Sequence, residues 1–188
     1  MNFWRGGASQ IAGSCLGCVG DKNKEVEMDA IAMLKKEHLE VAALFKQLEK
    51  ARAAKARQVI FEKIADALAV HATIEERHFY PAVMKTQTED LLLEAVEEHL
   101  EIKRVISDML DMDAEDDQFA AKATVLQEDI EHHVKEEETD LFPKVEKLFD
   151  KAELESIAAA MEETQEELLS EGNPRNAIPG ETEKAAPL

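Results

Sequence analysis

Apolar residues recur at steps of three and four along most of the chain, which is the period of an amphipathic α-helix. These stripes predict four long helices at about 28–50, 55–84, 89–112 and 117–149, followed by a shorter helix at about 152–170. The polar segments between them, such as 85–88, predict short connections. The pattern therefore predicts an all-α chain in which each helix buries one apolar face.

Each long helix has a histidine within its apolar stripe. In the first helix, His38 follows Ile31 and Leu34 and precedes Val41. The other three long helices contain His71, His99 and His133. Because an apolar stripe faces the interior, we expect all four imidazoles to point toward one common axis.

The chain repeats itself across these helices. The segment EHLEV at 37–41 returns as EHLEI at 98–102, and HATIEERHFYPAV at 71–83 returns position by position as HVKEEETDLFPKV at 133–145. Each half therefore contains a single histidine and then a His-x3-Glu-x5-Pro motif. An internal repeat this rich in metal-ligand residue types is the strongest signal in the sequence.

The spacing of the motif explains what the repeated residues can do. Residues four apart lie on one face of a helix, so each motif histidine and its glutamate can point at the same place. A buried carboxylate without a partner costs several kcal/mol or takes up a proton, and a metal ion removes that cost. Four imidazoles and two carboxylates exceed one tetrahedral zinc site and suit two ions of the iron type, with both carboxylates as bridges. The predicted ligands are His38, His71, Glu75, His99, His133 and Glu137.

These motifs resemble those of the hemerythrin-like, or HHE cation-binding, family. That family has a lone histidine and then His-x3-Glu followed by an aromatic residue and proline, and the pattern occurs twice, as it does here over roughly 28–150. The resemblance implies an up-down four-helix bundle that holds a non-haem di-iron centre. One position departs from the oxygen-carrying hemerythrins, which have a further histidine four residues after the third-helix histidine, where this chain has Lys103.

The resemblance implies a di-iron protein that binds or reacts with dioxygen or a related small oxidant, such as peroxide or nitric oxide. An alternative is a di-iron enzyme with peroxidase-like, catalase-like or iron-oxidising activity. A second alternative is a structural bundle in which metal merely holds the helices together for interaction with other proteins. The sequence does not decide whether the chain is an enzyme.

Prolines follow both motif glutamates. Pro81 and Pro143 lie in otherwise helical segments, where proline removes one hydrogen bond and clashes with the preceding turn. We therefore expect a kink or a tightened turn just after Glu75, and the same relation at Glu137. Tyr80 and the other aromatic residues beside the prolines are expected to close the end of the core.

Several polar residues near the motifs have two interpretations. Glu76 and Glu138 are repeated beside the motif glutamates, and they either accept hydrogen bonds from ligand imidazoles or are solvated. His78 lies on the inner stripe and is either a core polar residue or a proton relay or extra ligand.

His132 competes with His133 for the ligand position, because Glu136 follows His132 at the same spacing at which Glu137 follows His133. The repeat favours His133, since only His133 lies as far from Pro143 as the first motif histidine lies from its own proline.

The charge balance restricts the partners. Forty-one acidic and 22 basic residues give a formal net charge of −19, which argues against nucleic acid and anionic membranes as partners and favours cations. No apolar run is long enough to span a bilayer, so we expect a cytoplasmic protein.

The two ends of the chain carry weaker signals. Residues 1–24 are rich in Gly and Ser and predict a flexible arm; they include Cys15 and Cys18, either an incidental or locally oxidised pair or a redox or metal site. The bundle is assigned to 25–150 and the additional helix to 151–171. Residues 172–188 are rich in Pro and Ala, and we expect a disordered tail there.

Overall fold

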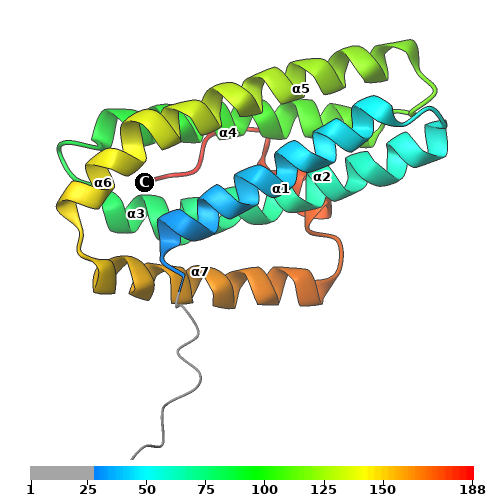
Figure 1. Ribbon diagram of the computed structural model, residues 1–188. Coiled ribbons are helices and arrows are strands. Elements are labelled where there is room, and N and C mark those ends of the chain that lie inside the picture. The colour runs from blue at the N-terminus through cyan, green and yellow to red at the C-terminus, as the bar shows by residue number, and fades with distance from the viewer. Residues whose placement is uncertain (1–27) are drawn as a thin grey trace, which may run out of the picture.

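The computed structural model of the protein describes residues 28–188, so the predicted N-terminal arm and the cysteine pair lie outside the described residues. Four long helices form the bundle (Figure 1): α1 (Ala30–Lys50), α2 (Ala54–Ile74), α4 (Glu89–Leu110) and α5 (Asp117–Glu136). α1 packs on α2, α4 packs on α5, and α2 also contacts α4. The predicted all-α, hemerythrin-like four-helix fold is confirmed.

The additional C-terminal helix is α7 (Lys151–Glu171), which lies along the outside of the bundle against α1 and α2 (Figure 1). Its N-terminus has a capping box: the Asp150 side chain accepts from the Glu153 amide, and the Glu153 side chain accepts from the Asp150 amide. Between residues 28 and 188, no helix is both long and apolar enough to cross a bilayer.

Both motif segments contain a π-helical turn. These turns are η1 (Glu75–Phe79), which leads into α3 (Tyr80–Val83), and η2 (Glu137–Leu141), which leads into α6 (Phe142–Leu148). The Tyr80 amide donates to the carbonyl five residues back, and the Phe142 amide does the same. Pro81 and Pro143 follow directly. The turns are therefore wider than those of an α-helix, which corrects the expectation of a tightened turn. The extra residue in each turn gives room for a proline ring.

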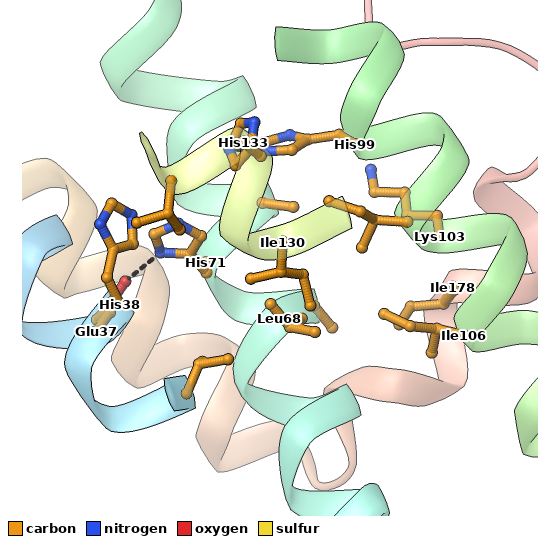
Figure 2. A pocket seen from close by; sticks show the side chains of 15 residues that line it. Glu37, His38, Leu68, His71, His99, Lys103, Ile106, Ile130, His133 and Ile178 are labelled. Carbon is orange, nitrogen blue, oxygen red and sulfur yellow. Dashed lines mark hydrogen bonds and ion pairs between the residues drawn. The ribbon is translucent and has the colours of Figure 1, made fainter. Parts of the chain in front are cut away.

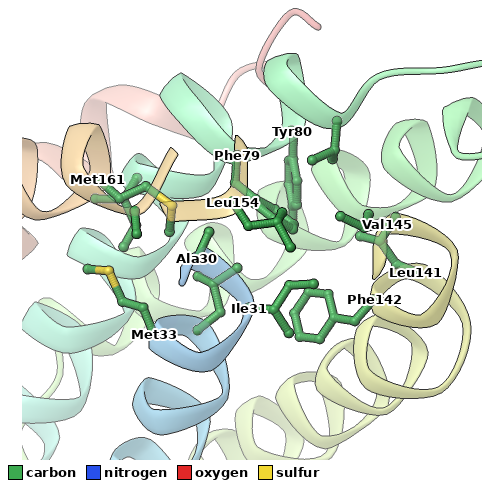
Figure 3. Packing of buried hydrophobic residues seen from close by; sticks show 14 of the residues in the cluster. Ala30, Ile31, Met33, Phe79, Tyr80, Leu141, Phe142, Val145, Leu154 and Met161 are labelled. Atoms are coloured by element: carbon green, nitrogen blue, oxygen red, sulfur yellow. The ribbon is translucent and has the colours of Figure 1, made fainter. Parts of the chain in front are cut away.

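Two apolar clusters fill the bundle, one on each side of the predicted ligands. The first contains aromatic and aliphatic residues from the motif ends and α7, including Phe79, Phe142 and Met161 (Figure 3). The second is built around Phe61 and Leu126 at the other end. In each long helix the histidine falls in the chain between residues of the two clusters. The polar centre is therefore enclosed by apolar packing along the bundle axis.

The end of the chain is ordered, which corrects the expectation of a disordered tail from residue 172. Gly172 ends α7 with a φ of 128°, and Pro174–Glu181 forms the 3-10 helix η3, which packs against α2 and α4. The Arg175 guanidinium pairs with Asp66 and Glu62 on α2. Ile178 is only 1% exposed and belongs to the second apolar cluster. One buried side chain and one ion-paired arginine fix this segment, and neither produces a periodic pattern in the sequence.

We expect Ile178→Ala to lower the free energy of unfolding by about 2–4 kcal/mol, because it removes a fully buried aliphatic side chain and leaves a cavity. Leu188→Ala is the matched control, since Leu188 is 39% exposed at the end of the same segment, and it should change stability by less than about 0.5 kcal/mol. Urea unfolding followed by circular dichroism measures both. Equal effects of the two substitutions would contradict the packing of this segment.

Candidate metal centre

The six predicted ligand residues lie together in the middle of the bundle, each on a different element or at a different turn. Each long helix contributes one histidine, and each π-turn begins with one glutamate. Their exposed fractions are low: His38 7%, His71 6%, Glu75 0%, His99 3%, His133 3% and Glu137 2%.

The donor atoms form two adjoining groups. In the first, atoms of His38, His71, Glu75 and Glu137 all lie within 4.8 Å of one another, and in the second the same holds for Glu75, His99 and His133. Glu75 belongs to both groups. Glu137 also lies between them, because its Oε2 is 3.2 Å from His38 Nε2 and 3.6 Å from His133 Nε2. The two carboxylates therefore separate two pairs of imidazoles.

The unpaired atoms of this centre fit a metal. Five buried donor atoms find no hydrogen-bond partner within residues 28–188: Nε2 of His38, Nε2 of His71, both carboxylate oxygens of Glu75 and Oε2 of Glu137. Burial of unpaired polar atoms costs about 1–3 kcal/mol each, and more for charged groups. Bound cations would satisfy all five. Mixed imidazole and carboxylate donors suit iron and related divalent metals.

Each of the four histidines is held from behind by a glutamate. The carboxylate accepts a hydrogen bond from Nδ1–H, as Figure 2 shows for Glu37 and His71. The four bonds are Glu37–His71 (2.7 Å), Glu76–His99 (3.0 Å), Glu98–His133 (2.7 Å) and Glu138–His38 (2.8 Å). Because Nδ1 of each ring donates to a carboxylate, Nε2 is the nitrogen that faces the centre, and it can bind a metal once it carries no proton.

These four glutamates, which we call the backing glutamates (Glu37, Glu76, Glu98 and Glu138), join the helices in a closed ring. The bonds run from α1 to α2, from η1 to α4, from α4 to α5, and from η2 back to α1. Glu76 and Glu138 thus orient imidazoles, which decides between the two interpretations of the sequence. Glu37 and Glu98 received no role in the sequence analysis, although each directly precedes a ligand histidine in the repeated EHLE segment.

The buried acids and bases share protons unevenly. Burial, and then the charge of Glu137, raises the pKa of Glu75 well above its ordinary value. Burial acts in the same direction on Glu137, but His133 and His38 outweigh it and lower the pKa of that carboxyl. Burial lowers the pKa of His38, yet the nearby carboxylates of Glu137 and Glu138 outweigh this and raise it to about 9. A cation that binds here must displace protons from Glu75 and His38.

Lys103 does not reach the centre as a ligand. It is 6% exposed, and its ammonium donates to both oxygens of Glu76, at 3.0 and 2.8 Å, and pairs with Glu181 of η3 at 2.8 Å (Figure 2 shows its position). Burial lowers the pKa of Lys103, but the charge of Glu76 and the bond to Glu181 outweigh it and raise the pKa. The protonated amine has no lone pair for a metal, and it braces the carboxylate behind His99.

Tyr80 makes a polar contact that its place beside Pro81 did not reveal. Its hydroxyl donates to Glu137 Oε1 at 3.0 Å and lies 3.4 Å from His99 Nε2, with its ring stacked on that imidazole. Burial raises the pKa of Tyr80 well above its ordinary value, so the phenol keeps its proton. Phe142 is the counterpart in the second half and stacks on His38 at 6.0 Å without a hydroxyl.

The two remaining histidines of the motif regions lie outside the centre. His78 Nε2 is 2.7 Å from the Thr164 hydroxyl of α7, which agrees with a core polar residue and not with an extra ligand. His132 points outward with 61% of its side chain exposed, whereas the His133 side chain is 3% exposed. The structure therefore directs His133, not His132, toward the other predicted ligands.

A partly open cavity of about 30 Å³ lies beside the four imidazoles (Figure 2). Its far wall is aliphatic and consists of Val41, Leu68, Ile102, Ile106, Ile130 and Ile178. The last of these comes from η3, so the C-terminal segment closes this side of the cavity. The space suits one small uncharged molecule.

Comparisons with known proteins agree with this geometry. The family described as "Hemerythrin HHE cation binding domain" matches residues 29–145. The crystal structure of a hemerythrin HHE cation binding domain-containing protein from Mycobacterium kansasii has a TM-score of 0.66 and 25% identity, and the match covers 80% of this chain and 96% of that chain. A curated relative from a Nostoc strain, named DNA nickase, is 28% identical over 137 residues, which are 73% of this chain but only 38% of the relative.

His133→Ala should abolish metal binding at one of the two donor groups, because the inward imidazole is lost. His132→Ala should leave the metal content of the buried centre nearly unchanged after weakly bound metal is washed away, since that ring faces outward. Elemental analysis of both variants after equilibration with ferrous iron under anaerobic conditions measures this. Equal iron loss in both variants would show that His133 is not the ligand.

Removal of the metal should lower the melting temperature by roughly 5–15 °C, since about 3–4 kcal/mol of binding free energy is lost and each kcal/mol corresponds to about 2–4 °C at this chain length. Calorimetry of loaded and chelated protein measures the shift. The His133→Ala variant is the control and should respond less to chelation. An unchanged melting curve after verified metal removal would contradict the stabilising role of the ions.

Proposed function

This chain belongs to the hemerythrin HHE cation binding domain family, and we propose that its buried centre holds two iron ions that react with dioxygen or a related small oxidant such as peroxide or nitric oxide. Family membership and the His/Glu cluster make it a metal-binding helical protein. The proposal of two ions is carried by the two donor groups that share Glu75 and by the five buried atoms of these residues that have no hydrogen-bond partner.

The choice of two iron ions follows from the donor set. Two imidazoles per group and two carboxylates between the groups provide too many donors for one tetrahedral ion. Iron held by histidine and carboxylate, with positions left free, supplies the redox chemistry by which small oxidants are reduced. The proposed ligands are His38, His71, Glu75, His99, His133 and Glu137.

Lys103 favours reaction over reversible storage. It occupies the position at which the oxygen carriers of this family have an additional histidine, and its ammonium is held by Glu76 and Glu181. The group that contains His99 therefore has no further imidazole from this position. Two iron ions held by these residues would supply two-metal redox chemistry, which favours reduction of a small oxidant over its storage.

The surrounding residues control access and protons. The aliphatic wall of the cavity admits a small uncharged oxidant and excludes anions and larger molecules. The Tyr80 phenol donates a hydrogen bond to Glu137 at 3.0 Å, and burial raises its pKa, so the phenol keeps its proton beside the predicted ligands. Reduction of peroxide to water consumes protons, so Tyr80 specifically favours a peroxide-reducing enzyme as the second candidate function.

The similarity to a protein named DNA nickase does not lead us to propose action on DNA. The chain spans 38% of that relative, and its net charge of −19 opposes binding to a phosphate backbone. We propose dioxygen or another small oxidant as the partner, with no role for nucleic acid or membrane.

Mixing of reduced, iron-loaded protein with dioxygen tests the proposal. We expect rapid and irreversible consumption of dioxygen with oxidation of both irons. Stopped-flow absorption measures the oxidation of the irons, and an oxygen electrode measures the consumption of dioxygen. Zinc-loaded protein is the control and should consume none, because zinc has no redox chemistry. Full recovery of dioxygen and of the reduced spectrum on evacuation would identify a reversible carrier instead.

A further inference from the structure

A third group of potential metal ligands lies on the surface, outside the buried centre. It consists of His132 and Glu136, one turn apart on α5, and Glu98 on α4. His132 Nε2 is 3.4 Å from Glu98 Oε1 and 3.4 Å from Glu136 Oε1. The side chain of His132 is 61% exposed, so the group is open to solvent.

These separations fit a shared cation better than direct hydrogen bonds. Strong hydrogen bonds from imidazole to carboxylate are shorter, at about 2.7–2.9 Å. A divalent metal with bonds of about 2.0–2.2 Å in a tetrahedral arrangement holds neighbouring donor atoms about 3.4 Å apart. The imidazole and two carboxylates form a mixed N/O set with room for water as a fourth ligand.

Glu98 connects this surface group to the buried centre. While its Oε1 faces His132, its Oε2 accepts the hydrogen bond from His133 Nδ1 at 2.7 Å. One carboxylate thus belongs to both the backing ring and the surface group. Only the side chain of Glu98 would separate a cation at the surface group from His133 of the centre.

A narrow cavity of about 10 Å³ lies between the two places. Glu98 and Glu136 of the surface group line it together with His133 and Glu137 of the centre. Glu137 is 2% exposed, and its Oε2 is one of the buried atoms without a hydrogen-bond partner between residues 28 and 188. Carboxylates therefore line one part of this small space and Leu91, Ala95 and Leu141 line the rest, so the carboxylates lead from the surface group to the buried donors.

The surroundings concentrate negative charge at this face. Partial burial raises the pKa of Asp129, and the negative charges of the nearby Glu101, Glu128 and Glu98 raise it further. The nearby His132 lowers it. A surface of one sign raises the local concentration of ions of the opposite sign and the rate at which they bind.

The internal repeat provides a comparison within the same molecule. In the first half, the positions of His132 and Glu136 are taken by Val70 and Ile74, which are 3% and 0% exposed. Both belong to the apolar cluster that includes α7 residues, and Gln165 of α7 donates to Glu37, the counterpart of Glu98. The additional helix closes this face in the first half, and only the second half presents a polar surface group.

We propose that His132, Glu98 and Glu136 form a surface site for divalent metal, through which Fe²⁺ is loaded into the buried centre. This proposal rests on the proposed function of the centre. It separates two routes: cations pass between Glu98 and Glu136, and the small oxidant uses the other cavity, which Ile178 lines.

The rate of metal uptake tests the proposal. Apoprotein is mixed with Co²⁺, whose visible absorption reports occupancy of the buried centre independently of any activity. His132→Ala and Glu136→Gln should fill to the same final absorbance as the unaltered chain but at least about tenfold more slowly, because the cation is no longer concentrated and held at the mouth of the route. Glu98 is left intact because it orients His133. Glu163→Gln on the exposed face of α7 is the control for charge and should load at the normal rate.

A second measurement detects the surface site directly. With the centre already filled, manganese titration followed by electron paramagnetic resonance should show one additional, weaker ion, and His132→Ala should remove it. Unchanged loading rates in both variants, equal slowing in Glu163→Gln, or an additional ion that survives His132→Ala would each overturn the proposal. A chain that never takes up two Co²⁺ ions in its centre would overturn the proposed function, and this loading route with it.

Discussion

The structure depends on one constraint, which is that charged and polar donors buried in an apolar bundle must be paired. Glu75 is fully buried and lies among four imidazoles, between two apolar clusters. The backing glutamates satisfy the outer nitrogens of the histidines, and cations satisfy the inner atoms. The ring of four glutamate–histidine bonds links all four long helices, so the same interactions that orient the ligands also set the packing of the bundle.

The sequence predicted those features that depend on local spacing. His71 and Glu75 are one turn apart, and the repeat revealed the second copy of that pair. Features that depend on contacts between distant segments were missed. Glu37 became recognisable as a partner of His71 only when α1 and α2 were placed side by side. The C-terminal segment is held in place because Ile178 is buried and η3 packs against α2 and α4. No periodic pattern in the sequence indicates this packing.

The two halves of the repeat have diverged around a shared centre. Tyr80 brings a hydroxyl where Phe142 has none, and Lys103 and η3 cover one side of the centre. α7 covers the first half, whereas the second half leaves His132 open to solvent. The symmetric part of the sequence therefore contains the predicted metal ligands, and the asymmetric part surrounds them and differs between the two halves.

Anomalous X-ray diffraction at the iron edge, on crystals of iron-loaded protein, tests the central claim most directly. The account predicts two peaks in the bundle core, one beside His38 and His71 and the other beside His99 and His133, with the Glu75 carboxylate between them. A single peak coordinated by all four imidazoles, or peaks only at the surface of the molecule, would contradict a preorganised two-ion centre.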